Sequence, residues 1–343
     1  MNASDFSLTL LAWYAENGRA LPWRGTHDAY RVWVSEVILQ QTRVAQGYDY
    51  FLRFMQRFPT VEALAKAEED EVLREWQGLG YYSRARNLHA AARQVMEMGG
   101  FPTTYEGIRS LKGVGDYTAA AIASLAYGLP RAVVDGNVYR VLARHFGIDT
   151  PIDTTEGKRL FAALAQDLLV AERPADYNQA IMDFGALLCT PKSPQCIQCP
   201  LLETCQARRE GQVEALPVKQ HEKRVRDRYF TYIYIRCAGE TLFQRRGEGD
   251  IWQGLYQMPM KETEQAMSPS EVEVWLGKYG HLEQLRSGVL HQLTHQRLHA
   301  DLYLLTCTQR PPLDGLWIKE SERDRYAVPR LVDGLLGEVT YLG

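Results

Sequence analysis

The sequence lacks the excess of positive charge by which many nucleic-acid-binding proteins are recognised. Its 343 residues contain 39 lysines and arginines against 42 aspartates and glutamates, which gives a formal net charge of −3. Residues 1–215 hold 22 basic and 25 acidic residues, and residues 216–343 hold 17 of each. On charge alone we would not expect a DNA-binding protein, so any binding of DNA has to come from local groups.

The sequence also shows no signal peptide and no membrane-spanning segment. The first residues, Met1–Ser7, lack the basic and apolar regions of a signal peptide. No apolar run approaches the ~20 residues that a membrane span needs. The chain also has no internal repeat and no low-complexity tract. The ordinary composition, with 45% hydrophobic and 24% charged residues, argues against disorder, collagen and coiled coil. We expect a cytoplasmic, globular protein of more than one domain that has no membrane partner.

In the first two thirds of the chain, apolar residues recur at helical spacing. This spacing predicts helices over residues 28–41, 116–127 and 137–146. Gly-x-Gly sequences at 78–80 and 113–115 interrupt the helical pattern. No long segment before residue 215 alternates polar and apolar residues. Residues 1–215 are therefore predicted to form an all-helical domain.

The composition changes after residue 215. Residues 216–228 are polar and largely basic, which indicates a linker that is either solvated or close to a polyanion. Aromatic and β-branched residues then predict a hairpin formed by 229–237 and 241–244, and a further strand at 302–307. Ser268 and Glu271 form a capping box that opens a helix. Residues 229–343 are therefore predicted to form a smaller α+β domain.

Four of the six cysteines lie within seventeen residues, namely Cys189, Cys196, Cys199 and Cys205. Four thiolates on short loops can converge on one zinc ion or one iron–sulfur cluster. A zinc ribbon usually has two Cys-x2-Cys pairs, and this segment has only one. Because all four ligands of such a centre come from the protein, a structural or DNA-sensing role is favoured over a catalytic one. Cys237 and Cys307 lie in strand-like segments and are interpreted as buried thiols.

Residues 109–127 have the form of a helix–hairpin–helix. Gly113 and Gly115 permit a tight turn and leave backbone N–H groups free at the start of the next helix. Such N–H groups bind phosphate without any net positive charge. Taken alone, however, the same residues favour a plain αα-hairpin.

Two carboxylates stand in positions that suit acid–base chemistry. Asp135 follows an apolar pair and directly precedes a helix, where the helix dipole and free N–H groups favour the ionised form. Glu36 lies in a strongly apolar helix, where burial would raise its pKa. Without further context, an ordinary N-cap aspartate and a helix-surface glutamate are the simpler interpretations.

Several motifs, in the same order, resemble those of the endonuclease III and MutY class of DNA glycosylases. They are Leu-Pro-Trp-Arg at 21–24, the segments 32–42, 78–88 and 178–186, the hairpin at 109–127 and the uneven spacing of the cysteines at 189–205. The resemblance extends over residues 5–210. It implies an all-α helix–hairpin–helix glycosylase fold with one [4Fe–4S] cluster held by the four cysteines.

The residue at position 117 distinguishes two branches of this superfamily. The bifunctional glycosylase/lyases carry a lysine there, which forms an imine with the sugar. The phenol of Tyr117 cannot form an imine, so the chain resembles the MutY family of adenine DNA glycosylases, which use water alone. An endonuclease III-like glycosylase/lyase for oxidised pyrimidines is the alternative enzyme. A non-catalytic protein that binds damaged DNA is the alternative without activity.

The resemblance implies a division of labour between the two carboxylates. Glu36 would protonate adenine at N7, and Asp135 would stabilise the oxocarbenium-like sugar cation, as in glycoside hydrolysis. Asn137 would hold Asp135 by a hydrogen bond, and Tyr117 would support the cation and shape the pocket.

The resemblance also assigns positions that contact the DNA, from which the target base must be flipped out. Tyr81 would intercalate beside the lesion, and Gln41 would fill the space that the flipped base leaves. The remaining positions line the adenine pocket or hold phosphate, and they are Arg19, Arg24, Gln179, Gly113 and Gly115. Some relatives have glutamate in place of Gln179.

The predicted α+β domain resembles the Nudix-like lesion-recognition domain of the MutY family. Residues 254–259 fit its early strand region, whereas 268–279 lack the Arg-Glu pair and the glutamates with which Nudix hydrolases bind Mg²⁺. The family reads 8-oxoguanine with Phe-Ser-His, and the equivalent here is Leu293-Thr294-His295. Thr294 and His295 keep the hydroxyl and the imidazole, while the aromatic ring is replaced. Histidines also recur at 291, 295 and 299, but a loop entering a strand explains the segment better than a zinc site.

Together these observations predict a monomeric, monofunctional adenine glycosylase that acts on duplex DNA. We expect it to remove adenine mispaired with 8-oxoguanine, and also adenine opposite guanine, in base excision repair.

Overall fold

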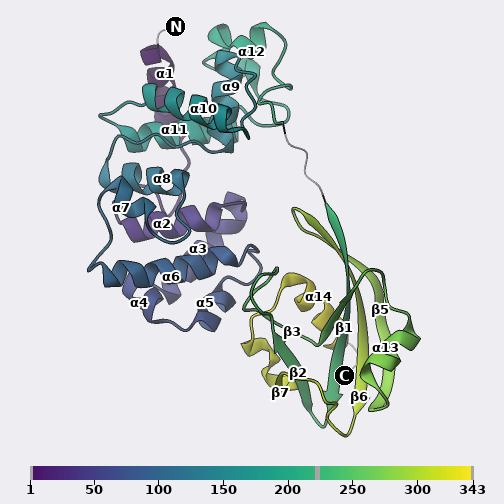
Figure 1. Cartoon of the computed structure of the whole chain (residues 1–343). Helices are drawn as coiled ribbons and strands as arrows, with labels where there is room; N and C mark the ends of the chain where they lie inside the picture. Colours follow the sequence, from purple (N-terminus) through teal and green to yellow (C-terminus); the bar gives the residue numbers. More distant parts are fainter. Residues whose placement is uncertain (1–2, 221–224, 341–343) are drawn as a thin grey trace. The chain divides into compact units, whose positions relative to one another are not determined.

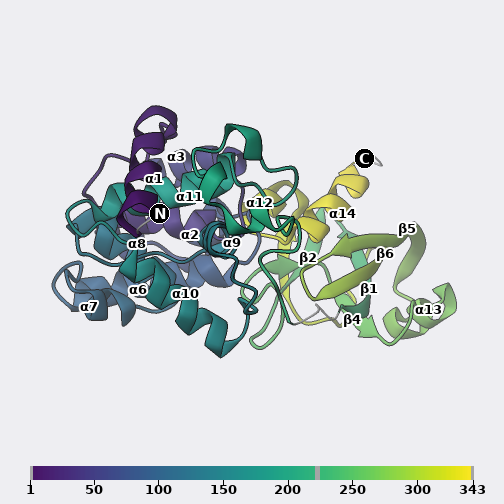
Figure 2. The ribbon, with the colours of Figure 1, turned by 90° about the horizontal axis from the view of Figure 1, so that it is seen from above.

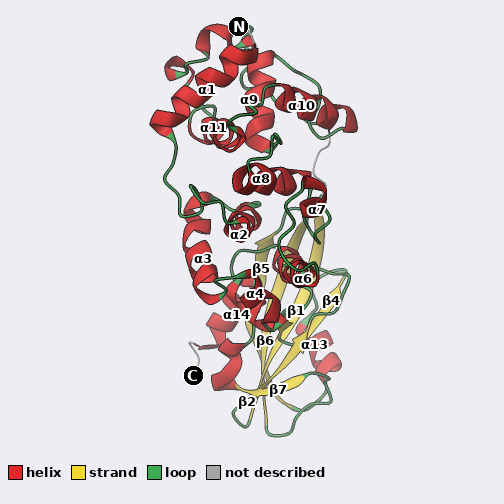
Figure 3. Ribbon diagram, turned by 90° about the vertical axis from the view of Figure 1, so that its left-hand side faces the viewer, coloured by secondary structure: helices red, strands yellow, loops and turns green. Residues whose placement is uncertain are grey.

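The computed structural model describes residues 3–220 and 225–340, which form two compact units. Within these ranges, one unit comprises residues 3–66 and 87–220, and the other comprises residues 67–86 and 225–340. The strands of the described chain all lie in the second unit, as the colouring by secondary structure shows (Figure 3). Part of the linker predicted at 216–228, residues 221–224, lies outside the described residues. No helix in the described ranges is both long and apolar enough to cross a membrane.

Helices make up the first unit, as the periodicity predicted. The expected helices at 28–41, 116–127 and 137–146 correspond to α2, α8 and α9 and are confirmed to within two residues. The helices are α1 (Ala3–Asn17), α2 (Ala29–Leu39), α3 (Val44–Arg57), α4 (Val61–Lys66), α6 (Ser83–Glu97), α7 (Tyr105–Arg109), α8 (Asp116–Tyr127), α9 (Gly136–Phe146), α10 (Thr155–Asp167), α11 (Pro174–Leu187) and α12 (Gln206–Arg209), with 3₁₀ turns η1 (Cys196–Gln198) and η2 (Leu202–Thr204). The first turn of α6 belongs to the second unit.

Local chemistry sets the ends of these helices. Asp28 caps α2 by accepting hydrogen bonds from the backbone N–H groups of Tyr30 and Arg31, at 2.9 and 3.3 Å. Gly128 and Gly147 end α8 and α9 in the left-handed conformation, with φ of 65° and 66°, which a residue without Cβ adopts at low cost.

Close helix packing builds the frame around the two candidate carboxylates. α8 packs against α2, and its alanines Ala119 and Ala121 are fully buried. α11 lies beside both α1 and α9 (Figure 2). A Cβ atom on Gly185 of α11 would lie 2.7 Å from Cβ of Asn137, so only glycine allows α11 to approach the start of α9 this closely.

The second unit is built on a seven-stranded sheet in the order β3-β2-β1-β6-β5, with β4 paired to β1 and β7 paired to β2. β1 and β6 are parallel along their full length, and the other pairs are antiparallel. The elements are α5 (Glu69–Glu75), β1 (Arg226–Cys237), β2 (Glu240–Arg245), β3 (Tyr256–Gln257), β4 (Met260–Thr263), α13 (Pro269–Leu276), β5 (Gly280–Gln292), β6 (Gln296–Cys307), β7 (Leu316–Lys319), the 3₁₀ helix η3 (Glu320–Arg325) and α14 (Arg330–Thr340).

Alternation along β1 gives this sheet two apolar faces. Phe230, Tyr232 and Tyr234 pack in one cluster with side chains of α14, and Ile233 and Ile235 pack in another with side chains of α13. The two helices therefore cover opposite faces of the sheet (Figure 1). The hairpin around 238–239 and the capping box at the start of α13 are confirmed, because β1 pairs with β2 and both capping hydrogen bonds are formed.

Candidate active site

Glu36 and Tyr117 face each other between the packed helices α2 and α8. Glu36 lies in the second half of α2 with 7% of its surface exposed, and the Tyr117 hydroxyl donates a hydrogen bond of 2.7 Å to its Oε2. Burial raises the pKa of Glu36 to about 7, although the Tyr117 hydrogen bond and the nearby Arg24 oppose that rise. Burial also raises the pKa of Tyr117 well above its ordinary value. The pair therefore presents a carboxylic acid that holds its proton close to neutral pH.

Asp135 is the N-cap of α9. Its carboxylate accepts hydrogen bonds of 2.8 Å from the backbone N–H groups of Asn137 and Val138, and another of 2.8 Å from the Asn137 side-chain amide. Burial raises the pKa of Asp135, and these hydrogen bonds oppose the rise. The sequence predicts that Asp135 is a helix cap, which favours its ionised form. It does not predict the burial of Asp135, which favours the protonated form. The charge of Asp135 in turn raises the pKa of Glu36, so the two carboxylates interact electrostatically.

Arg140 fixes the orientation of Asn137. Its Nη2 donates to Asn137 Oδ1 at 2.8 Å and to the Gly185 carbonyl at 2.6 Å, while its Nε donates to the Cys189 carbonyl at 2.7 Å. Since Arg140 takes the amide oxygen of Asn137, the amide nitrogen is directed toward Asp135. The same guanidinium joins this N-cap to the first residue of the cysteine loop.

Arg19, Arg24 and Gln179 are held by side chains that sequence reasoning did not single out. Arg24 donates to Asp183 through Nη1 at 2.6 Å and Nη2 at 2.7 Å, and Arg19 donates to the same carboxylate through Nε at 2.9 Å. Tyr14 donates to Gln179 Oε1 at 2.5 Å. The three predicted pocket residues are thus positioned by a buried aspartate and a tyrosine.

The four cysteines of the loop line one cavity. Arg144 of α9, only 2% exposed, closes part of this cavity, and its Nη1 lies 3.4 Å from Cys189 Sγ as a hydrogen-bond donor. The same guanidinium donates to the carbonyls of Thr190 and Pro191, at 2.8 and 3.2 Å. Burial, together with the charges of the other three thiolates, raises the pKa of Cys199 to about 11, although a backbone hydrogen bond from Leu201 opposes the rise. Among the described side chains, no three histidines, cysteines or carboxylates are arranged to hold a single metal ion.

The hairpin glycines occupy a tight turn before α8. Gly113 has a φ of 76°, and a Cβ atom on it would lie 2.6 Å from Cβ of Asn87. Gly115 is the N-cap of α8 and has no side chain that could accept from the first turn. An N-terminus of this kind presents N–H groups to an anion.

Comparisons with known proteins agree with this architecture. Residues 34–166 match the HhH-GPD superfamily base excision DNA repair protein, and residues 231–338 match the NUDIX domain. The adenine DNA glycosylase of Buchnera aphidicola subsp. Schizaphis graminum is 31% identical over 343 residues, which cover 96% of this chain and 97% of that protein. The chain belongs to the adenine DNA glycosylase family.

Some other relatives match a smaller share of the chain. The adenine DNA glycosylase of Homo sapiens is 47% identical over 222 residues, which cover 62% of this chain and 41% of the human protein. This family member therefore spans less than half of the human relative's length and nearly all of the Buchnera one. A solved structure of a thermostable thymine-DNA glycosylase aligns with a TM-score of 0.57 and 30% identity, covering 61% of this chain and 97% of that one.

Two further positions that the MutY resemblance singled out, Tyr81 and Thr294, contact each other within the second unit. The Tyr81 and Thr294 hydroxyl groups share a hydrogen bond, and the Arg84 guanidinium carbon lies 5.6 Å from the centre of the Tyr81 ring. Tyr81 is 49% exposed and has a φ of 47°, which is uncommon for a residue with a side chain. Thr294 and the exposed His295 lie in the turn that joins β5 to β6.

Gln41 lies beyond the end of α2, although the apolar spacing placed it in the helix predicted over residues 28–41. α2 ends at Leu39, and Gln41 is exposed in the turn that follows, with a φ of 56°. The structure therefore joins Glu36, Tyr117, Asp135 and Asn137 in one group next to Arg24, while Gln41 and the hairpin glycines lie in surface turns.

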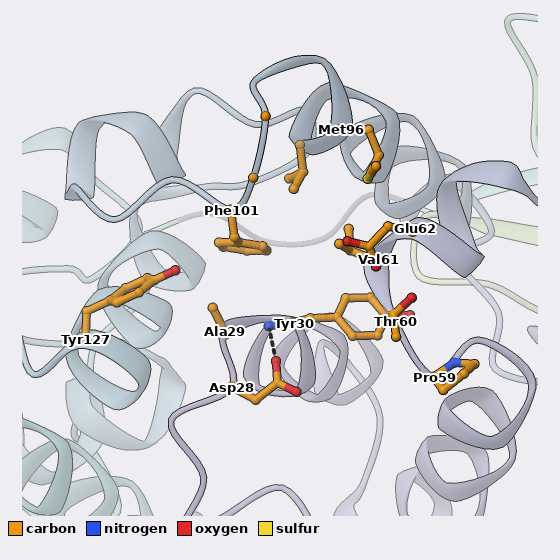
Figure 4. A pocket seen from close by; sticks show the side chains of 13 residues that line it. Asp28, Ala29, Tyr30, Pro59, Thr60, Val61, Glu62, Met96, Phe101 and Tyr127 are labelled. Atoms are coloured by element: carbon orange, nitrogen blue, oxygen red, sulfur yellow. Dashed lines mark hydrogen bonds between the residues drawn. The ribbon is translucent and has the colours of Figure 1, made fainter.

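A separate hollow lies at the start of α2. Asp28, Tyr30, Phe101 and Tyr127 are among its lining side chains (Figure 4), and none of the predicted site residues is. One oxygen of Asp28 is engaged by the first turn of α2. The hollow is therefore distinct from the site that contains Glu36 and Asp135.

Proposed function

We propose that this chain is a monofunctional glycosylase that removes adenine mispaired with 8-oxoguanine, or with guanine, from duplex DNA. One observation carries the proposal: the hydroxyl of Tyr117, and not a lysine amine, contacts the buried Glu36. The Tyr117 phenol cannot form an imine with the sugar, so water is the nucleophile that we expect. The family membership of the chain supports adenine as the base that is removed.

In the proposed reaction, Glu36 is the general acid. Its proton passes to N7 of the flipped adenine, and the electrons of the bond between C1′ and N9 leave with the base. The Asp135 carboxylate stabilises the positive charge that develops on the sugar. Water then adds to C1′ and gives its proton to a carboxylate of the pair.

The two carboxylates impose opposite requirements on pH. Glu36 must be protonated, so the rate falls as pH rises through its pKa of about 7. Asp135 must be ionised, so the rate falls as pH drops through its own pKa, which burial raises. A bell-shaped dependence of the rate on pH is the expected result.

The cysteine loop is proposed to hold one [4Fe–4S] cluster. Its thiols fit this group because all four line one cavity, and because Arg144 donates toward Cys189 and supplies positive charge beside the thiolates. Cys189, Cys196, Cys199 and Cys205 would be the ligands. The cluster would supply a structural cross-link of the loop, and no step of base removal passes through it.

Recognition of the mispair is proposed to be divided between the two parts of the chain. Residues 1–215 would carry the chemistry, and residues 229–343 would read the lesion. The linker at 216–228 would join the two parts. Thr294 and His295 would contact 8-oxoguanine, Tyr81 would intercalate beside it, and Gln41 would fill the vacated stack. The exposure of Tyr81, Gln41 and His295 supports these roles. We propose that a monomer carries out this recognition.

Single-turnover base release tests the proposal. Duplexes with adenine opposite 8-oxoguanine, guanine or thymine would be incubated with excess protein, and strand breaks measured with and without alkali. We expect breaks only after alkali, fastest opposite 8-oxoguanine and absent opposite thymine. No release of adenine would contradict the proposal. Strand cleavage without alkali, with a protein–DNA adduct trapped by borohydride, would indicate the glycosylase/lyase alternative.

A further inference from the structure

Asp183 is a fully buried carboxylate of α11 with no assigned role, and it lies against two predicted pocket arginines. Resting on the function proposed above, we propose that Asp183 is a positioning residue for base removal. It neutralises Arg24, so that this cation does not hold Glu36 in its ionised form. The proposal concerns how the general acid keeps its proton, and it adds no group that touches the substrate.

The geometry around Asp183 is that of a charge-balancing site. Both of its oxygens accept from Arg24, at 2.6 and 2.7 Å, in the paired arrangement of two parallel hydrogen bonds. Arg19 adds its Nε at 2.9 Å and its backbone N–H at 3.1 Å, and its Nη2 also contacts the carboxylate. Although burial raises the pKa of Asp183, the hydrogen bonds from the two arginines hold it below its ordinary value. Asp183 is therefore an anion at neutral pH.

Arg24 connects this anion to the catalytic acid. Three groups act on the charge of Glu36, namely Tyr117 from α8, Asp135 from the N-cap of α9 and Arg24 from the segment before α2. Among them Arg24 is the one cation, and it favours the ionised form of Glu36. Tyr14 also faces Arg24, with the guanidinium carbon 5.8 Å from its ring centre, but its phenol is neutral near pH 7, since its ordinary pKa of 10.0 lies well above 7 and burial raises it further.

A buried ion pair could also serve only to hold α11 against the segment before α2. Its loss would then lower stability or substrate affinity but leave the pH dependence of the chemical step in place. Charge balance predicts something different, because an unbalanced Arg24 stabilises the Glu36 carboxylate. The structural role and the charge-balancing role therefore differ in one measurable quantity, the pH at which the rate of base release falls on the alkaline side.

The experiment measures single-turnover adenine release between pH 5 and 9.5 in the full chain, with thermal unfolding as the check on folding. In Asp183→Asn, we expect the alkaline fall in rate to move about one pH unit lower, since an opposite charge nearby lowers a carboxyl pKa by roughly 1–3 units. Above pH 8 this is about a tenfold loss of rate. Asp183→Glu, which retains the charge, should keep the fall at its wild-type position. Asp176→Asn is the matched control, because Asp176 lies in the same helix but is 49% exposed.

Two further variants keep the test decisive if Asp183→Asn does not fold. Arg24→Gln removes the cation and should move the alkaline fall to higher pH, opposite in sign to Asp183→Asn. The double variant Arg24→Gln with Asp183→Asn should return it to within about half a unit of wild type, because paired mutations of contacting groups reveal their coupling. An Asp183→Asn profile at the wild-type position, or an Arg24→Gln profile moved to lower pH, would overturn the inference. A wild-type protein that releases no adenine would contradict the proposed function itself.

Discussion

Replacing Asp135 by asparagine separates the charge of this residue from its role as a helix cap. Asparagine is about as good an N-cap as aspartate, so its Oδ1 can still accept from the N–H groups of Asn137 and Val138. What changes is the hydrogen bond from the Asn137 side-chain amide to Asp135 Oδ2. In the variant, the Nδ2 amide group of the new asparagine replaces Oδ2, so two amide nitrogens would face each other. Arg140 prevents Asn137 from rotating to compensate, because it occupies the Asn137 oxygen.

The expected cost in stability is therefore modest. One lost hydrogen bond to a charged group costs about 1.5–3 kcal/mol. The loss of charge is more consequential for catalysis. Two unit charges 4 Å apart attract by about 4 kcal/mol at the effective dielectric constant of a protein. Without that attraction between Asp135 and the sugar cation, the rate of base release should fall by about a thousandfold.

Single-turnover release of adenine from a duplex with 8-oxoguanine, together with thermal unfolding, measures both effects. We expect Asp135→Asn to unfold within several degrees of wild type and to be at least about a thousandfold slower. Asp135→Ala serves as the comparison, because it also removes the cap and should lose about 1 kcal/mol more stability. A folded Asp135→Asn that works within tenfold of the wild-type rate would refute the electrostatic role.

Three other variants test the site and its support. Tyr117→Phe removes the hydrogen bond that stabilises ionised Glu36, so the alkaline fall in rate should move upward from about pH 7 by about one unit, and a shift downward would contradict the geometry. Asn178→Ala removes the acceptor 3.1 Å from the Val133 N–H and should lower the free energy of unfolding by about 2–3 kcal/mol in urea, while Asn17→Ala, at an exposed site, should change it little. Cys199→Ser should lose iron and visible absorbance, whereas Cys237→Ser should keep both; equal iron in the two variants would exclude the proposed cluster.

Local signals in the sequence were enough to predict much of the fold. The spacing of apolar residues located α2, α8 and α9, and the Ser268 capping box located the start of α13. These features depend on neighbours within a few residues, so a pattern along the chain contains them. The same logic placed Asp135 at the start of a helix, which the structure confirms.

Interactions between distant residues could not be predicted in this way. Asp183 lies 164 residues from Arg19 and 159 from Arg24, and an acidic residue between apolar neighbours does not indicate which cations it meets. The orientation of Asn137 likewise depends on Arg140, whose own partners include Gly185 and Cys189. The burial that raises the pKa of Asp135 also comes from packing between elements and not from its sequence neighbours.

The buried arginines change how the charge of this chain should be counted. Among the lysines and arginines in the described ranges 3–220 and 225–340, five arginines are less than 10% exposed, namely Arg84, Arg140, Arg144, Arg228 and Arg246. Arg19 and Arg24 are also neutralised by Asp183. These cations hold the protein together and are not available to displace the counterions of DNA. We therefore expect the logarithmic salt slope of duplex affinity to be smaller than the total of 39 basic residues would suggest, since each phosphate contact contributes about 0.9 to it. A titration of affinity against salt concentration would count the cations that remain for the phosphates.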